Sequence, residues 1–276
     1  MRGKVFAVLG IIALLAGPRF VAPVAGQGEE RGLVPVAVEI SHRLKNLPAP
    51  MQPSLAQAGA IAAAGPTTSA QCGGDGTTRV ITLSSFDPAH PGSQDVVFWK
   101  ETPTESPGKG NLWVAWDFLT TGFGRQDIIR CDQLATLQER LDGVIATDVS
   151  YFGDFLPRPD ESARLDVMVY SIVDEGYFET AFLFNVSGFF WPSLNHALDT
   201  NTIFLDSYDW TGRLGPYAAH PNEYEATLAH TLEHLIHRDR DPDEAAWVDE
   251  GLADLAGYLN GFGHPESAIV YYLAHH

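Results

Sequence analysis

The pattern of apolar positions divides the chain into a strand-rich part and a helical C-terminal part. Short runs of β-branched and aromatic residues, separated by turns with Pro or Gly, predict strands. These runs are TRVITLSSF (78–86), DVVFWK (95–100), NLWVAWDF (111–118), LDVMVYSI (165–172) and NTIFLDSY (201–208). Between the third and fourth runs, residues 132–147 predict an amphipathic helix, with one face made of Leu134, Leu137, Leu141, Val144 and Ile145. Strands, a packing helix, further strands and then helices favour an α+β fold.

Two helices are predicted near the C-terminus. Asn222, with Glu225 three residues later, is typical of a capping box and predicts a helix over residues 223–238. Pro242 lies in the charged turn RDRDPDE, which ends this helix. A second helix follows and ends at the pair Asn260-Gly261, a typical C-terminal cap.

The N-terminal region has the composition of an export signal followed by a linker. A short basic segment, an apolar run and small residues predict a signal peptide over residues 1–26, with a retained anchor as the alternative. The apolar run is short for a membrane span, so we expect no stable span after cleavage. Residues 27–75 are rich in Ala, Pro, Gly, Ser and Gln and predict a low-complexity propeptide or linker. Residues 76–276 then form one domain, which we expect to be incomplete because the chain stops at YYLAHH without a terminating element.

Charge and cysteine content narrow the partners and the compartment. The 276 residues have a formal net charge of −18, which argues against nucleic acid and anionic lipid as partners. The same acidity also fits simple solubility. Cys72 and Cys131 are the two cysteines, and in an exported protein they allow one disulfide. Two unpaired thiols are the alternative.

The first C-terminal helix presents histidines on one face and leucines on the other. His230 and His234 lie one turn apart, so that both imidazoles can bind a single Zn²⁺. On the second helix, Glu250 and Asp254 also lie one turn apart. A carboxylate that completes a His₂Glu set, with a nearby acid that orients a ligand histidine, is typical of catalytic zinc sites. The alternative is that both acids belong to a solvated helix face.

The segment TLAHTLEHLIHRDRDPDEAAWVDEGLADLAGYLNG (227–261) resembles the active-site region of secreted bacterial zinc metallopeptidases of the gluzincin type. The immune-inhibitor-A-like and hyicolysin-like families are the nearest in pattern, which is HExxH, a short spacer and a Trp-x-Asn-Glu-Gly-like segment. The resemblance implies a zincin-like domain with His230 and His234 as the first two zinc ligands. It implies Glu250 as the third ligand and Asp254 as the acid that supports a ligand histidine.

The segment departs from this pattern at the general base. The family's Glu directly after the first histidine is replaced by Thr231, whose hydroxyl is not a useful base near neutral pH. Glu233 is the local substitute, because residues 230–234 also spell the inverted motif HxxEH. Glu233, however, projects from the opposite side of the helix to Thr231. The alternative is that Glu233 is an ordinary surface residue. His237 is either an alternative third ligand or a residue that supports the site by packing.

These features predict a secreted, zinc-dependent metallopeptidase-like protein that hydrolyses peptide bonds with a metal-activated water. The expected partner is a peptide or protein substrate. Two alternatives remain open. One is a pseudopeptidase that binds zinc and peptide without cleavage, and the other is a metal-free secreted adhesion or structural domain.

Overall fold

The structure is a computed structural model. It describes residues 34–35, 72–87, 89–102, 108–115, 129–158, 164–174, 177 and 184–264, all within the unit Gly32–His276. The expected signal peptide, most of the expected linker and residues 265–276 lie outside the described residues.

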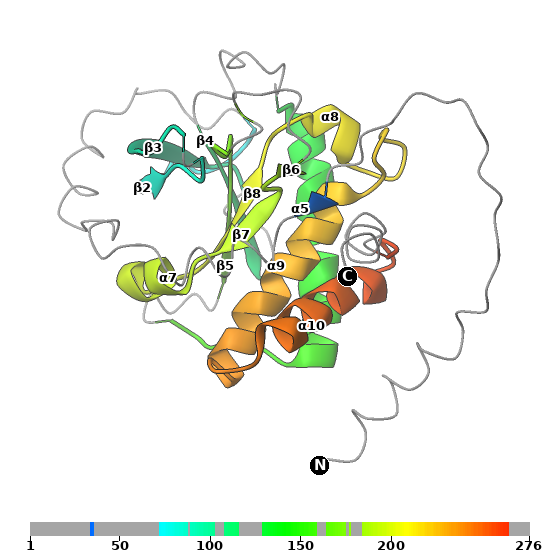
Figure 1. The fold of residues 1–276 in the computed structure, drawn as a ribbon. Helices are drawn as coiled ribbons and strands as arrows, with labels where there is room; N and C mark the ends of the chain where they lie inside the picture. The colour runs from blue at the N-terminus through cyan, green and yellow to red at the C-terminus, as the bar shows by residue number, and fades with distance from the viewer. Residues whose placement is uncertain are drawn as a thin grey trace, which may run out of the picture. The chain divides into compact units, whose positions relative to one another are not determined.

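A six-stranded mixed sheet forms the centre of the fold (Figure 1). Its strands, in spatial order, are β2 (Thr78–Ser84), β3 (Ser93–Lys100), β4 (Gly110–Ala115), β5 (Leu165–Tyr170), β8 (Asn201–Asp206) and β7 (Gly188–Phe190). The pairs β2–β3 and β3–β4 are antiparallel, β4, β5 and β8 run parallel, and β7 returns antiparallel to β8. A separate short pair joins β1 (Val34–Pro35) to β6 (Phe184–Asn185) in parallel.

The middle strands are buried on both faces. Every residue of β4, β5 and β8 is buried, which is the usual condition of parallel strands in a sheet covered by other elements. Apolar side chains such as Leu165, Val167 and Leu205 are completely shielded from solvent. These strands are therefore covered by other parts of the molecule on both faces of the sheet.

Two long helices pack on the sheet and on each other, and a third helix packs on the one that follows later in the chain. α5 (Cys131–Phe152) contacts β4, and α9 (Glu223–Arg240) contacts β7, β8 and α5. α10 (Ala246–Leu259) lies against α9 (Figure 1). The shorter helices are α7 (Pro192–Leu198) and α8 (Trp210–Arg213).

The α+β class expected from the sequence is confirmed. Each of the five expected strands coincides with an observed strand, and the apolar face expected for residues 132–147 is the buried face of α5. α10 ends at Leu259 with Asn260 as its cap, as the sequence indicated. The edge strand β7 and the helices α7 and α8 were not predicted.

The start of α9 differs from the expected capping box. Asn222 is the residue before the helix, but it has a left-handed backbone with φ of 56°, and its side chain makes no capping bond. Glu225 is completely buried and accepts a hydrogen bond at 2.9 Å from the backbone N–H of Gly215. The Glu225 side chain therefore ties the first turn of α9 to the preceding loop instead of capping its own helix.

A glycine allows α9 to approach the edge of the sheet. A Cβ atom on Gly188 of β7 would lie 2.7 Å from the Phe204 carbonyl oxygen and 2.7 Å from Thr227 Cγ2 of α9. Contacts this short exclude a side chain unless the backbone moves. Gly188 therefore permits the close packing that places α9 beside β7.

A disulfide joins the segment before β2 to the start of α5. Cys72 and Cys131, which are 59 positions apart, have an S–S distance of 2.07 Å. Disulfides persist mainly in oxidising compartments, so this bond indicates an extracellular or otherwise exported protein. Within the described part of the chain, no helix combines the length and apolar character that a membrane span requires.

Candidate metal centre

Three ligand atoms from α9 and α10 converge on one point. His230 Nε2 and His234 Nε2 are 3.0 Å apart, and Glu250 Oε2 lies 3.5 Å from the first and 3.6 Å from the second. With zinc–ligand distances of about 2.1 Å, tetrahedral geometry separates ligand atoms by about 3.4 Å. The three observed separations therefore fit one zinc ion with only small adjustments.

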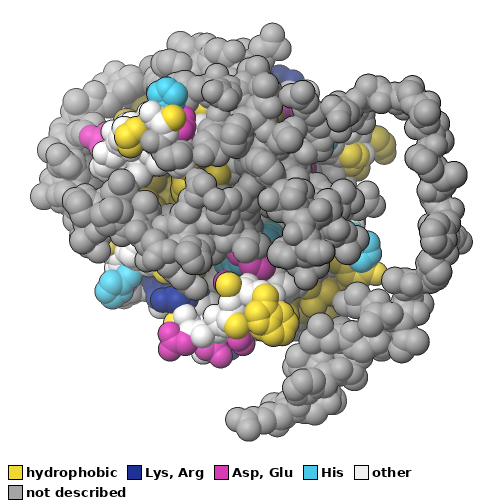
Figure 2. Space-filling model, viewed as in Figure 1, with side chains coloured by type: hydrophobic (Ala, Val, Ile, Leu, Met, Phe, Trp, Pro, Cys, Tyr) yellow, Lys and Arg dark blue, Asp and Glu magenta, His cyan; other side chains and the backbone are white. Residues whose placement is uncertain are grey.

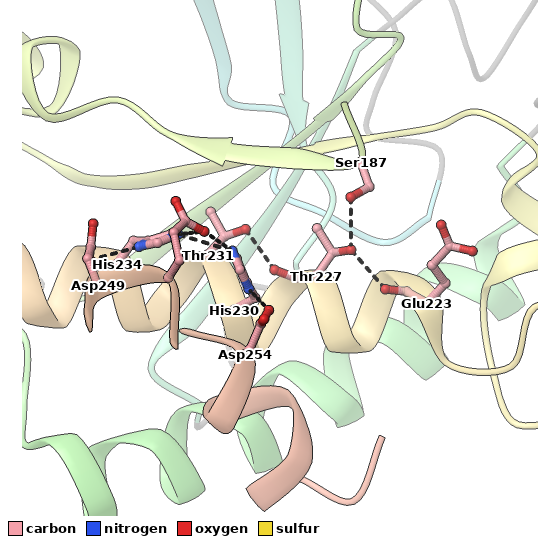
Figure 3. Close-up of polar contacts among 9 residues, drawn as sticks. Ser187, Glu223, Thr227, His230, Thr231, His234, Asp249 and Asp254 are labelled. Atoms are coloured by element: carbon pink, nitrogen blue, oxygen red, sulfur yellow. Dashed lines mark hydrogen bonds and ion pairs between the residues drawn. The ribbon is translucent and has the colours of Figure 1, made fainter. Parts of the chain in front are cut away.

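Each imidazole is held by a carboxylate from α10. His230 Nδ1 lies 3.1 Å from Asp254 Oδ1, and His234 Nδ1 lies 3.0 Å from Asp249 Oδ1. Figure 3 shows the two histidines adjacent on α9, with Asp249 and Asp254 on α10 directed toward them. Because Nδ1 donates a proton to the carboxylate, Nε2 of each neutral ring has a lone pair directed toward the other ring and Glu250.

The electrostatics of this group favour positive charge. Burial lowers the pKa of His234, but hydrogen bonds to Asp249 and Glu250 reverse the effect and raise the pKa to about 10. The pKa of His230 is also raised, because Asp254 and Glu250 outweigh burial. Burial would raise the pKa of Glu250, but the two imidazoles hold it far below its usual range. Either protons or a metal ion can supply the required positive charge.

The chemistry of the three donors fits zinc. Two imidazole nitrogens and one carboxylate oxygen form the His₂Glu set of many catalytic zinc sites. Glu250 is only 7% exposed, so the alternative of a solvated helix face does not describe this residue. His230, His234 and Glu250, called here the ligand triad, are thus the residues of α9 and α10 that could hold the metal.

Asp249 is a residue of this site that the sequence interpretation missed. Its carboxylate supports His234 as Asp254 supports His230, so each ligand histidine has its own acid. The spacing of one helical turn between Glu250 and Asp254 gave a signal for Asp254. For Asp249, the only available signal was its position directly before Glu250 in the first turn of the helix.

Thr231 follows His230, where the zinc-peptidase pattern has its glutamate, and its hydroxyl is already bound. Thr231 Oγ1 donates to the Thr227 carbonyl oxygen at 2.7 Å, and the residue is 1% exposed. Thr227 Oγ1 lies 3.2 Å from Ser187 Oγ, the residue next to β7 (Figure 3). Thr231 therefore bonds to its own helix on the side that packs near the sheet.

Glu233 is buried, so the alternative of a surface residue is wrong. The residue is 1% exposed, and burial raises its pKa to about 8. Glu233 Oε1 lies 3.4 Å from His237 Nδ1. Side-chain donor atoms of Glu233, His237 and Asp249 lie close together in a separate group. His237 therefore belongs to this group and not to the ligand triad.

No family model matches this chain, and no curated protein matches it either. The chemistry of the site is therefore inferred from the site itself.

Proposed function

We propose that this chain is a secreted, zinc-dependent metallopeptidase-like domain that hydrolyses peptide bonds. The main support is the convergence of His230 Nε2, His234 Nε2 and Glu250 Oε2 at separations of 3.0 to 3.6 Å. Bound zinc supplies a Lewis acid that polarises a water molecule and a peptide carbonyl. Asp249 and Asp254 fix the imidazole orientations, since each accepts the Nδ1 proton of one histidine.

Other features support this proposal without testing it. A metal-binding helix packed on a mixed sheet is compatible with a zincin-like fold. The disulfide and the basic-then-apolar N-terminal sequence both favour export through a signal peptide. The expected substrate is a peptide or protein.

A second candidate function is zinc-dependent binding of a peptide or protein without cleavage. The arrangement of the two possible bases favours it. Thr231 donates its hydroxyl proton to Thr227, and Glu233 Oε1 lies against His237. General-base assistance typically contributes about 10²- to 10⁴-fold in rate, so a site without a positioned base would cleave slowly.

The two candidates are separated by a protease assay on the wild type, Thr231→Glu and Glu233→Gln, with zinc content measured for each. Hydrolysis that Glu233→Gln abolishes, while the ligand triad keeps its zinc, supports catalysis with Glu233 as the base. Hydrolysis that appears only with Thr231→Glu supports a metal centre that lacks its base. Bound zinc with no hydrolysis in any variant supports the non-cleaving function.

Thr136→Glu is the matched control for Thr231→Glu. Thr136 is exposed on α5, and its hydroxyl donates to the Asp132 carbonyl oxygen at 3.0 Å, the same contact within a helix that Thr231 makes. The control therefore introduces a carboxylate at an exposed helical position away from the ligand triad. A chain without stoichiometric zinc would contradict both candidate functions.

A further inference from the structure

A second group of metal-ligand side chains lies beside the ligand triad. Ligand atoms of Glu233, His237 and Asp249 all fall within 4.8 Å of one another, and Glu233 Oε1 lies 3.4 Å from His237 Nδ1. Two of these side chains come from one face of α9 and the third from the first turn of α10. We call Glu233, His237 and Asp249 the second cluster.

The second cluster contains a buried carboxylate oxygen that lacks a partner. Glu233 is 1% exposed, and its Oε2 has no hydrogen-bond partner within the described residues. A buried carboxylate without compensation is costly, so the oxygen requires a proton or a cation. Asp148 of α5, which is also completely buried, adds to this requirement because its carboxylate raises the pKa of Glu233.

We propose that Glu233, His237 and Asp249 form a second divalent-cation site for an ion of the zinc class. One imidazole and two carboxylates suit borderline transition-metal ions better than they suit Ca²⁺, which prefers oxygen ligands alone. The 3.4 Å separation of Glu233 Oε1 and His237 Nδ1 equals the spacing of about 3.4 Å expected for two ligands of a tetrahedral ion.

Asp249 connects the two sites. Its Oδ1 accepts the proton of His234 Nδ1 at 3.0 Å, and a carboxylate has a second oxygen that can bind a cation. A cation bound to Asp249 lowers the negative charge on the carboxylate that accepts the His234 Nδ1 proton. Coupling between sites is reciprocal, so each ion weakens the binding of the other, and the second equivalent binds less tightly than the first.

The test is a titration of the chelator-treated full chain with Zn²⁺, read by calorimetry and by the zinc content after gel filtration. We expect two equivalents for the wild type, one for His237→Ala and one for His230→Ala. Glu233→Gln, a more conservative change, should also bind one equivalent. His196→Ala, at an exposed position of α7, is the control and should bind two. Circular dichroism verifies that each variant is folded.

The same titration separates failure of this proposal from failure of the proposed function. One equivalent in the wild type that His237→Ala retains and His230→Ala loses would overturn the second site, with Glu233 neutralised by a proton. One equivalent that His230→Ala retains and His237→Ala loses would support the second site and contradict the ligand triad. Two equivalents in His237→Ala would place the second ion elsewhere and overturn the proposal.

Discussion

Asp249 and Asp254 determine the orientation of the two imidazoles of the ligand triad. Their hydrogen bonds hold Nδ1 of each ring at 3.0 and 3.1 Å and keep Nε2 available for coordination. Carboxylates that support ligand histidines typically contribute about 10- to 100-fold in metal affinity. In a His237→Ala background, where the second cluster cannot bind, we expect Asp249→Asn and Asp254→Asn each to weaken zinc binding by about this factor, measured by competition with a chromophoric chelator.

Asp243→Asn is the matched control for these two substitutions. Asp243 is exposed in the turn between α9 and α10, and Figure 2 shows acidic side chains gathered at the lower edge of the view, where Figure 1 draws this turn. In the same background, the control should bind zinc as the His237→Ala chain does. An equal loss of affinity in all three variants would mean that general negative charge attracts the metal, without a specific role for the two hydrogen bonds.

Helical periodicity predicts the pairs His230–His234 and Glu250–Asp254, because it places residues one turn apart on one face. That the two pairs meet was implied by the resemblance to zinc metallopeptidases, and not by periodicity. Periodicity could not reveal that Asp249 supports His234, because this contact depends on how α10 packs across α9. The burial of Glu233 is likewise a result of packing. Local periodicity gives the direction of a side chain on a helix but not which other elements cover it.

At the scale of elements, α5 stabilises the sheet through its apolar face. Leu141 is fully buried, and a Cβ atom on Gly110 of β4 would lie 2.4 Å from Leu141 Cδ2, so helix and strand are in close contact. Leu141→Ala should lower the free energy of unfolding by about 2 to 5 kcal/mol in urea denaturation. Leu156→Ala, at a side chain that is 50% exposed, should cost far less. Equal losses in the two variants would contradict this packing.

Asp148 of α5 makes the stability of the helical layer depend on pH. Burial raises its pKa to about 7, although Asn260, the C-terminal cap of α10, donates a hydrogen bond to its Oδ1 at 2.7 Å. The unfolded chain has a pKa of about 3.9 at this residue. Its contribution to stability is therefore complete below about pH 4 and is lost as the pH rises toward 7.

Asp148→Asn should remove this dependence. The free energy of unfolding of the variant, relative to the wild type, should increase between pH 4 and pH 7, by at most about 4 kcal/mol. Denaturation at a series of pH values measures the difference, with the exposed Asp243→Asn as the control. A difference that stays constant across this range would show that Asp148 has the same pKa in the folded and unfolded chains.

Strands were predictable where a run of β-branched and aromatic residues persists over about six residues, as in β5, and long helices where an apolar face recurs with the helical period, as in α5. The strand β7 has three residues, one of them Gly188, and is too short for a period to be recognised. The start of α9 was located at Asn222, but the contact of Glu225 with Gly215 joins distant backbone and cannot be deduced from a local motif.

At the scale of the whole molecule, the disulfide between Cys72 and Cys131 closes a loop that contains β2, β3 and β4. For a separation of 59 residues, restriction of the unfolded chain is worth about 4 kcal/mol. Reduction should therefore lower the free energy of unfolding by about this amount, measured by denaturation with and without a reducing agent. Cys72→Ser with Cys131→Ser should give the same loss and no further response to reductant. Unchanged stability on reduction would contradict a structural role for the bond.

The central claim is that His230, His234 and Glu250 bind one zinc ion. It is tested most directly in a chain whose second cluster cannot bind zinc. In a His237→Ala chain treated with chelator, calorimetric titration with Zn²⁺ should show one tight equivalent. Adding Glu250→Ala should abolish this equivalent, while circular dichroism shows an unchanged fold. A His237→Ala chain that binds no zinc, or one whose binding survives the loss of Glu250, would contradict the account.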